Sequence, residues 1–175
     1  ACIDKAIDAG ATGLIFDVRF NPGGFKTELV QILDYLLPEG VLFRSLDYAG
    51  NEETESSDAH FVDLPMAVLV NEDSYSAAEF FAAAMQEYGA ASIIGTQTSG
   101  KGNFQTTFNL SDGSAVSISI GKYFTPEGKS LTDVGVTPDV VVDLPDEEYA
   151  KLYYKQLEQA DDAQLKAALE SLKTN

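Results

Sequence analysis

The sequence predicts an α/β fold, because strand and helix patterns alternate along it and because its composition supports a hydrophobic core. Between residues 14 and 94, short apolar runs alternate with segments in which apolar or alanine residues recur at helical spacing. An order of strand, helix, strand, helix and strand is typical of an α/β core. Apolar residues make up 45% of the 175 residues, and at this share disorder is not expected.

The first elements are defined by apolar runs and by the residues that end them. Residues 1–9 are expected to form part of a helix that stops at Gly10. Leu14–Val18 is a short apolar run closed by Asn-Pro-Gly-Gly, and such runs favour a strand buried on both faces. A helix should follow and end at the Pro-Glu-Gly of residues 38–40, because four apolar residues recur at helical spacing: Leu29, Ile32, Leu33 and Leu36.

The middle of the chain continues the alternation. Residues 41–48 and 66–70 are predicted strands, and the polar, acidic segment 50–58 between them is predicted to be an exposed loop. Residues 77–88 are rich in alanine and precede a glycine, which favours a helix with a glycine at its end. Residues 91–94 form the last predicted strand of the core.

The pattern then changes to a hairpin and a helical tail. Residues 104–110 and 115–124 flank Ser-Asp-Gly-Ser and are predicted to pair as a β-hairpin. A short strand is expected at 140–142. From about residue 147 the chain reads as helical and charged, with one apolar face formed by Leu165, Ala168, Leu169 and Leu172. We therefore expect a core of residues 1–145 and a helical extension of residues 146–175.

Charge and composition limit the partners. Eleven Lys and Arg stand against 28 Asp and Glu, a net charge of −17, which repels phosphates and disfavours nucleic acid and anionic membranes. One cysteine, Cys2, cannot form an internal disulfide, and one histidine, His60, is expected at the surface or at a strand edge. Neither a metal nor a cofactor is expected. No segment is long and apolar enough to span a bilayer and no signal peptide begins the chain, so we expect it to start inside a domain.

Residues Gly95–Lys101 match the first part of a phosphate-binding loop. That motif requires Ser or Thr after the lysine and a helix whose amides face the phosphate. Gly102 follows instead, and residues 104–108 have a strand pattern. Nucleotide binding is therefore not expected.

Ser76 lies where a predicted strand ends and a helix begins. A serine at this position faces the positive end of the helix dipole, where developing negative charge is stabilised by free amides. Serine is also common there simply as a helix N-cap. The G-x-S-x-G elbow is absent, because Ser74 and Ala78 occupy the positions of its glycines. Taken alone, this segment favours the N-cap.

Three segments together resemble the C-terminal processing peptidases, also called tail-specific proteases. Residues 17–24 resemble the family's D-L-R-x-N-P-G-G, residues 71–79 its N-x-x-S-A-S-A-S-E, and residues 95–105 its G-x-x-T-F-G-K-G-x-x-Q. Further segments fit in the expected order, namely Leu110–Ser114, Tyr123–Pro126 and Gly135–Asp139. The resemblance extends from about residue 13 to residue 142.

The resemblance implies a serine–lysine dyad. Ser76 corresponds to the nucleophile and Lys101 to the general base, at the separation found in the family, and Gln105 would hold the lysine in place. The oxyanion would be bound by two backbone amides, that of Ala77 and that of Gly23 or Gly24.

Physical reasoning is compatible with these roles. A serine hydroxyl needs a base, and lysine serves only when burial favours its neutral amine. On an extended strand Gln105 would face the same way as Lys101, and glycine amides are unobstructed by side chains. A surface lysine and a plain Asn-Pro-Gly-Gly turn remain the alternatives. The family pattern is broken at Tyr75, Ala78 and Ser99, and of these Tyr75 and Ser99 bear on substrate preference and rate.

The resemblance further implies a spiral of β-β-α units, as in ClpP and crotonase. It implies protein or peptide substrates cleaved near their C-termini, an extracytoplasmic location, and a PDZ domain in the full-length protein that this sequence does not contain. The core is expected to be incomplete at its N-terminus, and the helical tail suggests a homodimer. Two alternatives remain, a non-catalytic relative that binds peptides or hydrophobic ligands, and a crotonase-type acyl-CoA enzyme, for which basic residues are few.

Overall fold

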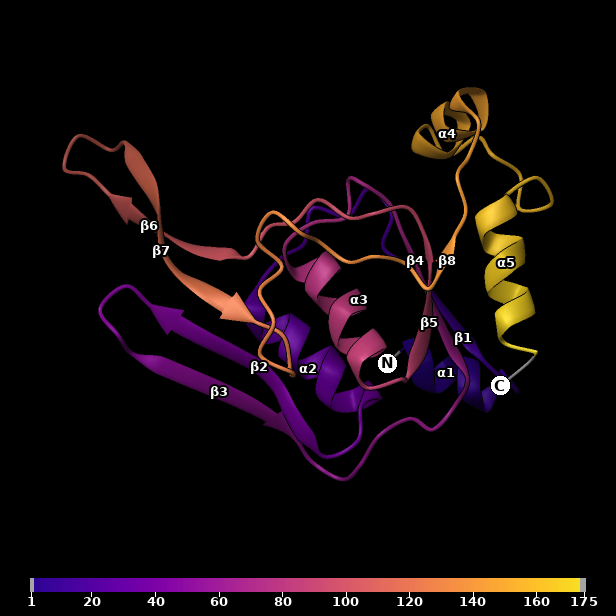
Figure 1. Cartoon of the computed structure of the whole chain (residues 1–175), viewed down its shortest axis with the longest axis horizontal. Helices are drawn as coiled ribbons and strands as arrows, with labels where there is room; N and C mark the ends of the chain where they lie inside the picture. Colours follow the sequence, from indigo (N-terminus) through magenta and orange to yellow (C-terminus); the bar gives the residue numbers. More distant parts are fainter. Residues whose placement is uncertain (1, 174–175) are drawn as a thin grey trace.

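The computed structural model describes residues 2–173 and contains two four-stranded sheets (Figure 1). One sheet is parallel throughout, with the order β1 (Leu14–Asp17), β4 (Met66–Val70), β5 (Ala91–Gly95) and β8 (Val140–Val141). The other is antiparallel, with the order β3 (Glu52–Ser57), β2 (Gly40–Asp47), β7 (Ala115–Phe124) and β6 (Asn103–Asn109). The predicted α/β class is confirmed.

Helices separate and cover the sheets (Figure 1). Between the sheets lie α2 (Lys26–Leu36) and α3 (Ala77–Glu87), whose apolar residues share one core with β2, β4 and β5. A second, smaller core lies on the other face of the parallel sheet, under α5 (Ala163–Ser171). The remaining helices are α1 (Cys2–Asp8) and α4 (Asp146–Tyr153). Among the described residues, none of these helices has the length and apolarity to cross a membrane.

The parallel sheet brings three of the resembling segments to one edge. The carboxyl ends of parallel strands lie together, and in open α/β sheets ligands bind at this edge. Residues 18–25, here called the NPGG loop, follow β1; residues 71–76, the serine loop, follow β4; and residues 96–102, the lysine loop, follow β5. Segments far apart in sequence are therefore neighbours in space.

The acidic segment predicted to be a loop is instead an edge strand. Residues 52–57 pair with β2 as β3. Acidic side chains are poor strand formers in isolation, but Lys26 forms ion pairs with Glu53 and Glu55 and so offsets their repulsion. A strand edge covered by carboxylates also resists pairing with other chains.

Two further predictions need correction. β1 is an edge strand and only half-buried, whereas β4 is buried on both faces. In the extension, α4 and α5 are separate helices, and Leu169 is 48% exposed while Gln164 is 2% exposed. Gln164 is buried because its amide has hydrogen-bond partners, which an apolar pattern does not reveal.

Candidate active site

Ser76 lies at the strained turn between β4 and α3. It is the N-cap of α3, with φ of 60° and ψ of −126°. A positive φ is uncommon for a non-glycine residue, and strain of this kind concentrates at functional sites. A nucleophile elbow places its serine on such a strand-to-helix turn. The turn is therefore elbow-like although the flanking glycines are absent.

A buried carboxylate joins the serine loop to the lysine loop. Glu79 is fully buried and accepts hydrogen bonds from the amides of Ser76, Gly100 and Lys101, at 3.3, 2.6 and 2.9 Å. The hydroxyl of Thr98 donates to the same carboxylate at 2.5 Å. The main chains on which the two predicted dyad residues stand are thus fixed to one side chain. Sequence reasoning quoted Glu79 as part of a motif but gave it no role.

The NPGG loop packs closely against Ser76. Gly23 has a φ of +87°, and a Cβ at this position would lie 2.7 Å from the Ala77 amide nitrogen and 3.0 Å from the Cβ of Ser76. A glycine is therefore required by both conformation and space. A Cβ on Gly24 would meet nothing within 4 Å.

The amides that were predicted to bind an oxyanion differ in their availability. The amide of Gly23 donates to Oδ1 of Asn21 at 2.9 Å. Among residues 2–173 the structure provides no acceptor for the amide of Gly24. Ala77 is the first residue of α3, and amides of a first helical turn have no partner in the helix itself. Gly24 and Ala77 thus offer the more available donors.

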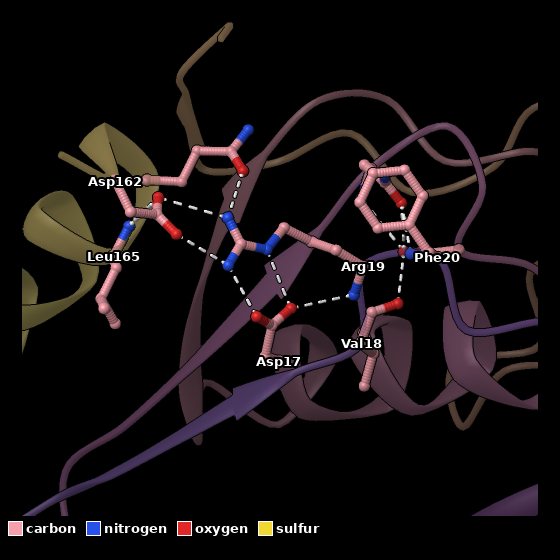
Figure 2. Close-up of polar contacts among 9 residues, drawn as sticks. Asp17, Val18, Arg19, Phe20, Asp162 and Leu165 are labelled. Atoms are coloured by element: carbon pink, nitrogen blue, oxygen red, sulfur yellow. Dashed lines mark hydrogen bonds and ion pairs between the residues drawn. The ribbon is translucent and has the colours of Figure 1, made fainter. Parts of the chain in front are cut away.

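Hydrogen bonds from the serine loop hold the NPGG loop. The side-chain oxygen of Asn71 accepts from the amide of Phe20 at 2.9 Å, and the hydroxyl of Ser74 donates to the carbonyl of Val18 at 2.7 Å. The amide of Tyr75 donates to the carbonyl of Asn21 at 3.2 Å. Figure 2 shows part of this set beside the contacts of Arg19.

The amine of Lys101 contacts an aromatic ring, whereas the main chain around it is held by hydrogen bonds. Its nitrogen lies over the ring of Tyr75, 5.5 Å from the ring centre. In the part of the chain that the structure describes, no carboxylate pairs with it, and no hydrogen bond joins it to Ser76 or to Gln105. Gln105 is exposed and lies on β6, which begins after Lys101. The three side chains nevertheless line one cavity.

Tyr123 connects the serine and the lysine. Its ring is 5% exposed and packs against Phe80 and Phe43, with ring centres 5.5 and 5.9 Å apart. The phenol donates to the carbonyl oxygen of Lys101, and the Ser76 side chain lies beside the phenol in the wall of the same cavity. Burial raises the pKa of Tyr123 far above its ordinary value, against a smaller lowering by Ser76. Tyr123 lies in the quoted Tyr-Phe-Thr-Pro segment, but its role was not predicted.

The cavity at these residues has a volume of about 650 Å³. Apolar and aromatic side chains form much of its wall, namely Leu29, Phe43, Phe80, Phe104, Ile120 and Tyr123. Gly23, Gly24, Ser76 and Ala77 also line it. One buried acceptor, Oδ1 of Asn103, has no partner among the described residues and belongs to a lining side chain. Such a cavity suits an extended apolar group next to polar main chain.

The structure gives no support for a histidine-based site, a phosphate-binding loop or a metal site among the described residues. His60 is at the surface as predicted, with its side chain 94% exposed, and it does not line the cavity. The segment 95–101 leads into β6 and not into a helix. Among residues 2–173, no three His, Cys, Asp or Glu side chains are grouped as a metal would require.

Comparison with known proteins identifies the family. The family model described as Peptidase family S41 matches residues 1–142. The chain belongs to peptidase family S41. The resemblance drawn from the motifs is thereby confirmed.

Relatives of this S41 chain are processing proteases. It is 34% identical over 166 residues to the carboxyl-terminal-processing protease of Synechocystis, covering 94% of this chain and 38% of that protein. It is 36% identical to the carboxy-terminal processing protease CtpA of Bacillus subtilis, covering 87% of this chain and 33% of that protein. The chain therefore spans about a third of the length of these relatives.

Solved structures agree with the S41 assignment. The photosystem II D1 C-terminal processing protease matches with a TM-score of 0.72 and 35% identity, over 81% of this chain and 37% of that one. A putative S41 protease from Bacteroides fragilis matches with a TM-score of 0.79 and 19% identity, over 97% of this chain and 47% of that one. The second match shows likeness of fold alone.

Proposed function

We propose that this chain carries the catalytic centre of a serine endopeptidase in which Ser76 is the nucleophile and Lys101 the general base. The observation that supports this most is the junction at Ser76. A serine with a positive φ stands at the N-terminus of α3, beside Gly23, and shares a cavity with Lys101. Glu79 fixes the main chains of both dyad residues.

The reaction proceeds through an acyl-enzyme. The neutral amine of Lys101 takes the proton of the Ser76 hydroxyl as its oxygen attacks the carbonyl carbon of the scissile peptide. The resulting oxyanion accepts hydrogen bonds from the amides of Ala77 and Gly24, with Gly23 keeping the turn closed. The protonated Lys101 then gives its proton to the leaving amine, and water hydrolyses the ester by the reverse route.

The base needs one side-chain movement. In the resting chain the Lys101 nitrogen lies over Tyr75 and the Ser76 hydroxyl lies near Tyr123. A substrate that enters the cavity excludes water, which favours the neutral amine. The amine then turns from the Tyr75 ring to Ser76, and Gln105, which lines the same cavity, provides an uncharged acceptor.

The substrate is an extended polypeptide with an apolar side chain before the cleaved bond. The aromatic wall of the cavity provides the site for that side chain, and the acidic surface disfavours anionic substrates. As in the named relatives, cleavage occurs near a C-terminus, and a PDZ domain elsewhere in the full-length protein captures that end. In this proposal the fold is the ClpP/crotonase-type spiral, formed by residues 1–145, and residues 146–175 are an extension of it. The protein acts outside the cytoplasm. It also forms homodimers.

Fluorophosphonate labelling tests the dyad. We expect labelling of the wild-type chain, mapped by mass spectrometry to Ser76, and its loss in Ser76→Ala and in Lys101→Ala. Matched controls are Ser111→Ala in the hairpin turn and Lys122→Ala on β7, an exposed serine and an exposed lysine that do not line the cavity. Absence of labelling in folded wild-type protein, alone and in the full-length form, would favour the non-catalytic relative instead.

A further inference from the structure

The C-terminal segment of the described chain, residues 145–173, touches both loops that carry the proposed catalytic groups. The family match ends at residue 142. Nothing in that match assigns a role to α4 or α5. These helices nevertheless make specific and largely polar contacts with the NPGG loop and the serine loop. Figure 2 shows one of these contacts, between Arg19 of the NPGG loop and Asp162.

Arg19 joins the NPGG loop to the N-terminus of α5. Its guanidinium donates to Asp17 at 2.9 and 2.6 Å, to Asp162 at 3.2 and 2.9 Å, and to Gln164 at 2.9 Å. A guanidinium has five N–H donors, and these contacts occupy all of them. The side chains of Arg19 and Asp162 are 4% and 5% exposed. Burial lowers the pKa of Arg19, but the two carboxylates outweigh it and raise the pKa above its ordinary value.

α5 is a fixed support for this contact. Asp162 also caps α5, because its carboxylate accepts from the amide of Leu165 at 2.9 Å. Gln164 donates to the carbonyl of Val142 at 2.7 Å, and Ala168 is fully buried against the parallel sheet. The groups that bind Arg19 are thus held by the sheet and are not free to follow the loop.

α4 makes the second contact with the NPGG loop. The ring of Phe20 meets those of Tyr149 and Tyr153 edge to face, with ring centres 5.1 and 5.4 Å apart. Phe20 has a φ of 58°, so its backbone is in a conformation that needs support from its surroundings. Arg19 and Phe20, two consecutive residues of the NPGG loop, are therefore both held by the helices α5 and α4.

Tyr149 also contacts the serine loop. Its hydroxyl donates to Oδ2 of Asp73 at 3.2 Å and interacts with Glu72. Burial, followed by these carboxylates, raises the pKa of Tyr149 well above its ordinary value, so the phenol keeps its proton and remains a donor. The side chain of Tyr149 therefore bridges the two loops. It contacts Asp73, which shortly precedes Ser76, and Phe20, which shortly precedes Gly23.

We propose that residues 146–173 are a positioning element of the active site, in which Arg19 and Tyr149 are the positioning residues that hold the NPGG loop and the serine loop in register. The proposal rests on the function proposed above. Catalysis depends on sub-ångström placement of donors around the oxyanion. Because Gly23 packs directly against Ser76, a small shift of the NPGG loop separates the two oxyanion donors without unfolding the core.

Three conservative variants test it. Arg19→Lys keeps the charge and loses the forked contact. Asp162→Asn keeps a good helix cap and loses the carboxylate. Tyr149→Phe keeps the ring on Phe20 and loses the hydroxyl. We expect each to label more slowly with fluorophosphonate, by about 10-fold in the maximal rate for Arg19→Lys, with the concentration for half-maximal rate changed less than about 2-fold.

The matched control is Tyr154→Phe, an exposed tyrosine on the same segment whose ring meets that of Tyr153 and whose hydroxyl has no hydrogen-bond partner within residues 2–173. It should label like the wild type. All rates are measured at temperatures where circular dichroism shows each variant fully folded. Variants that label at the wild-type rate under these conditions would overturn the proposal, because they would show that α4 and α5 serve folding alone.

Hydrogen exchange separates this proposal from the proposed function. Peptides that cover residues 14–25 and 69–79 should exchange faster in Arg19→Lys and in Tyr149→Phe, while peptides of β5 stay unchanged. This outcome is expected even if neither the chain nor the full-length protein labels, in which case the dyad is wrong but residues 146–173 still hold the two loops. Unchanged exchange in both loops would overturn the positioning even if Ser76 labels normally.

Discussion

The two sides of the proposed catalytic centre are built differently. On the serine side, backbone amides and carbonyls around Ser76 are held by many hydrogen bonds, from Asn71, Ser74 and Glu79. On the lysine side, the backbone of Lys101 is held equally well, but its amine has no polar partner among the described residues and rests on an aromatic ring.

This difference matches what each group has to do. An oxyanion site works by donors that are in place before charge develops, so it benefits from a rigid main chain. A lysine base has to be neutral when it accepts the proton, and a carboxylate partner would favour the charged form instead. Among residues 2–173, the side chains that line the cavity include one buried oxygen without a hydrogen-bond partner, Oδ1 of Asn103, and this acceptor is uncharged.

The largest loss of labelling and of stability is expected when Glu79 is removed, because this carboxylate binds the main chain on both the serine side and the lysine side. Glu79→Ala leaves three amides and one hydroxyl without their acceptor. A buried donor without a partner costs about 1–3 kcal/mol, so the variant should be destabilised by at least about 3 kcal/mol. Labelling of Ser76 should be lost even in the folded fraction. Denaturant unfolding and labelling measure the two effects.

Glu87→Ala is the matched control for this prediction. Glu87 lies near the end of the same helix and accepts from Thr125 and from the amide of Glu127. Its removal should reduce stability by about 1–2 kcal/mol and leave the labelling rate of folded protein unchanged. Equal loss of labelling in both variants would mean that stability, not the link between the loops, explains the effect of Glu79.

The next largest loss of labelling is expected for Gly23→Ala, in contrast to the same substitution at the adjacent Gly24. Gly23→Ala places a Cβ 2.7 Å from the Ala77 nitrogen, in a positive-φ conformation, and should displace the NPGG loop and reduce labelling at least about 100-fold. Gly24→Ala has open space and retains its amide, so it should label within about 3-fold of the wild type. Comparable rates in the two variants would contradict the proposed geometry.

A smaller effect is expected from the hydroxyl that joins the two sides. Tyr123→Phe keeps the ring in the core but removes the contacts with the Lys101 carbonyl and with Ser76. Labelling should slow about 10-fold, and stability should fall by about 1 kcal/mol. Tyr88→Phe is the control, because its phenol donates to the carbonyl of Val41, which does not line the cavity. If it slows labelling equally, Tyr123 has no specific role.

The sequence predicted well whatever depends on local pattern or on family motifs. The strands β4 and β5, the helix α3 and the hairpin of β6 and β7 lie where periodicity and turn residues put them. The three motif segments were predicted to act together, and the parallel sheet explains their proximity, because each follows the carboxyl end of a strand.

What the sequence left unpredicted depends on partners that are distant along the chain. β3 is a strand only because β2 pairs with it and Lys26 offsets its charge. Gln164 is buried because Arg19, far away in the sequence, binds its amide oxygen. Likewise the resting position of the Lys101 amine depends on Tyr75, a residue recognised only as a departure from the family pattern.

Tyr75 should have the smallest effect, and an effect of opposite sign. A ring face attracts an amine cation by about 0.5–1 kcal/mol, so the Tyr75 ring holds the Lys101 nitrogen in its resting position. Tyr75→Ala removes that contact, leaves the amine freer to reach Ser76, and should raise the labelling rate about 2- to 5-fold. Tyr75→Phe, which retains a ring face, should behave like the wild type. The rate is measured under the same conditions for all three proteins. A slower Tyr75→Ala would show that the ring is a necessary wall of the cavity, and the difference between the two sides would then lie in packing and not in the contact between the amine and the ring.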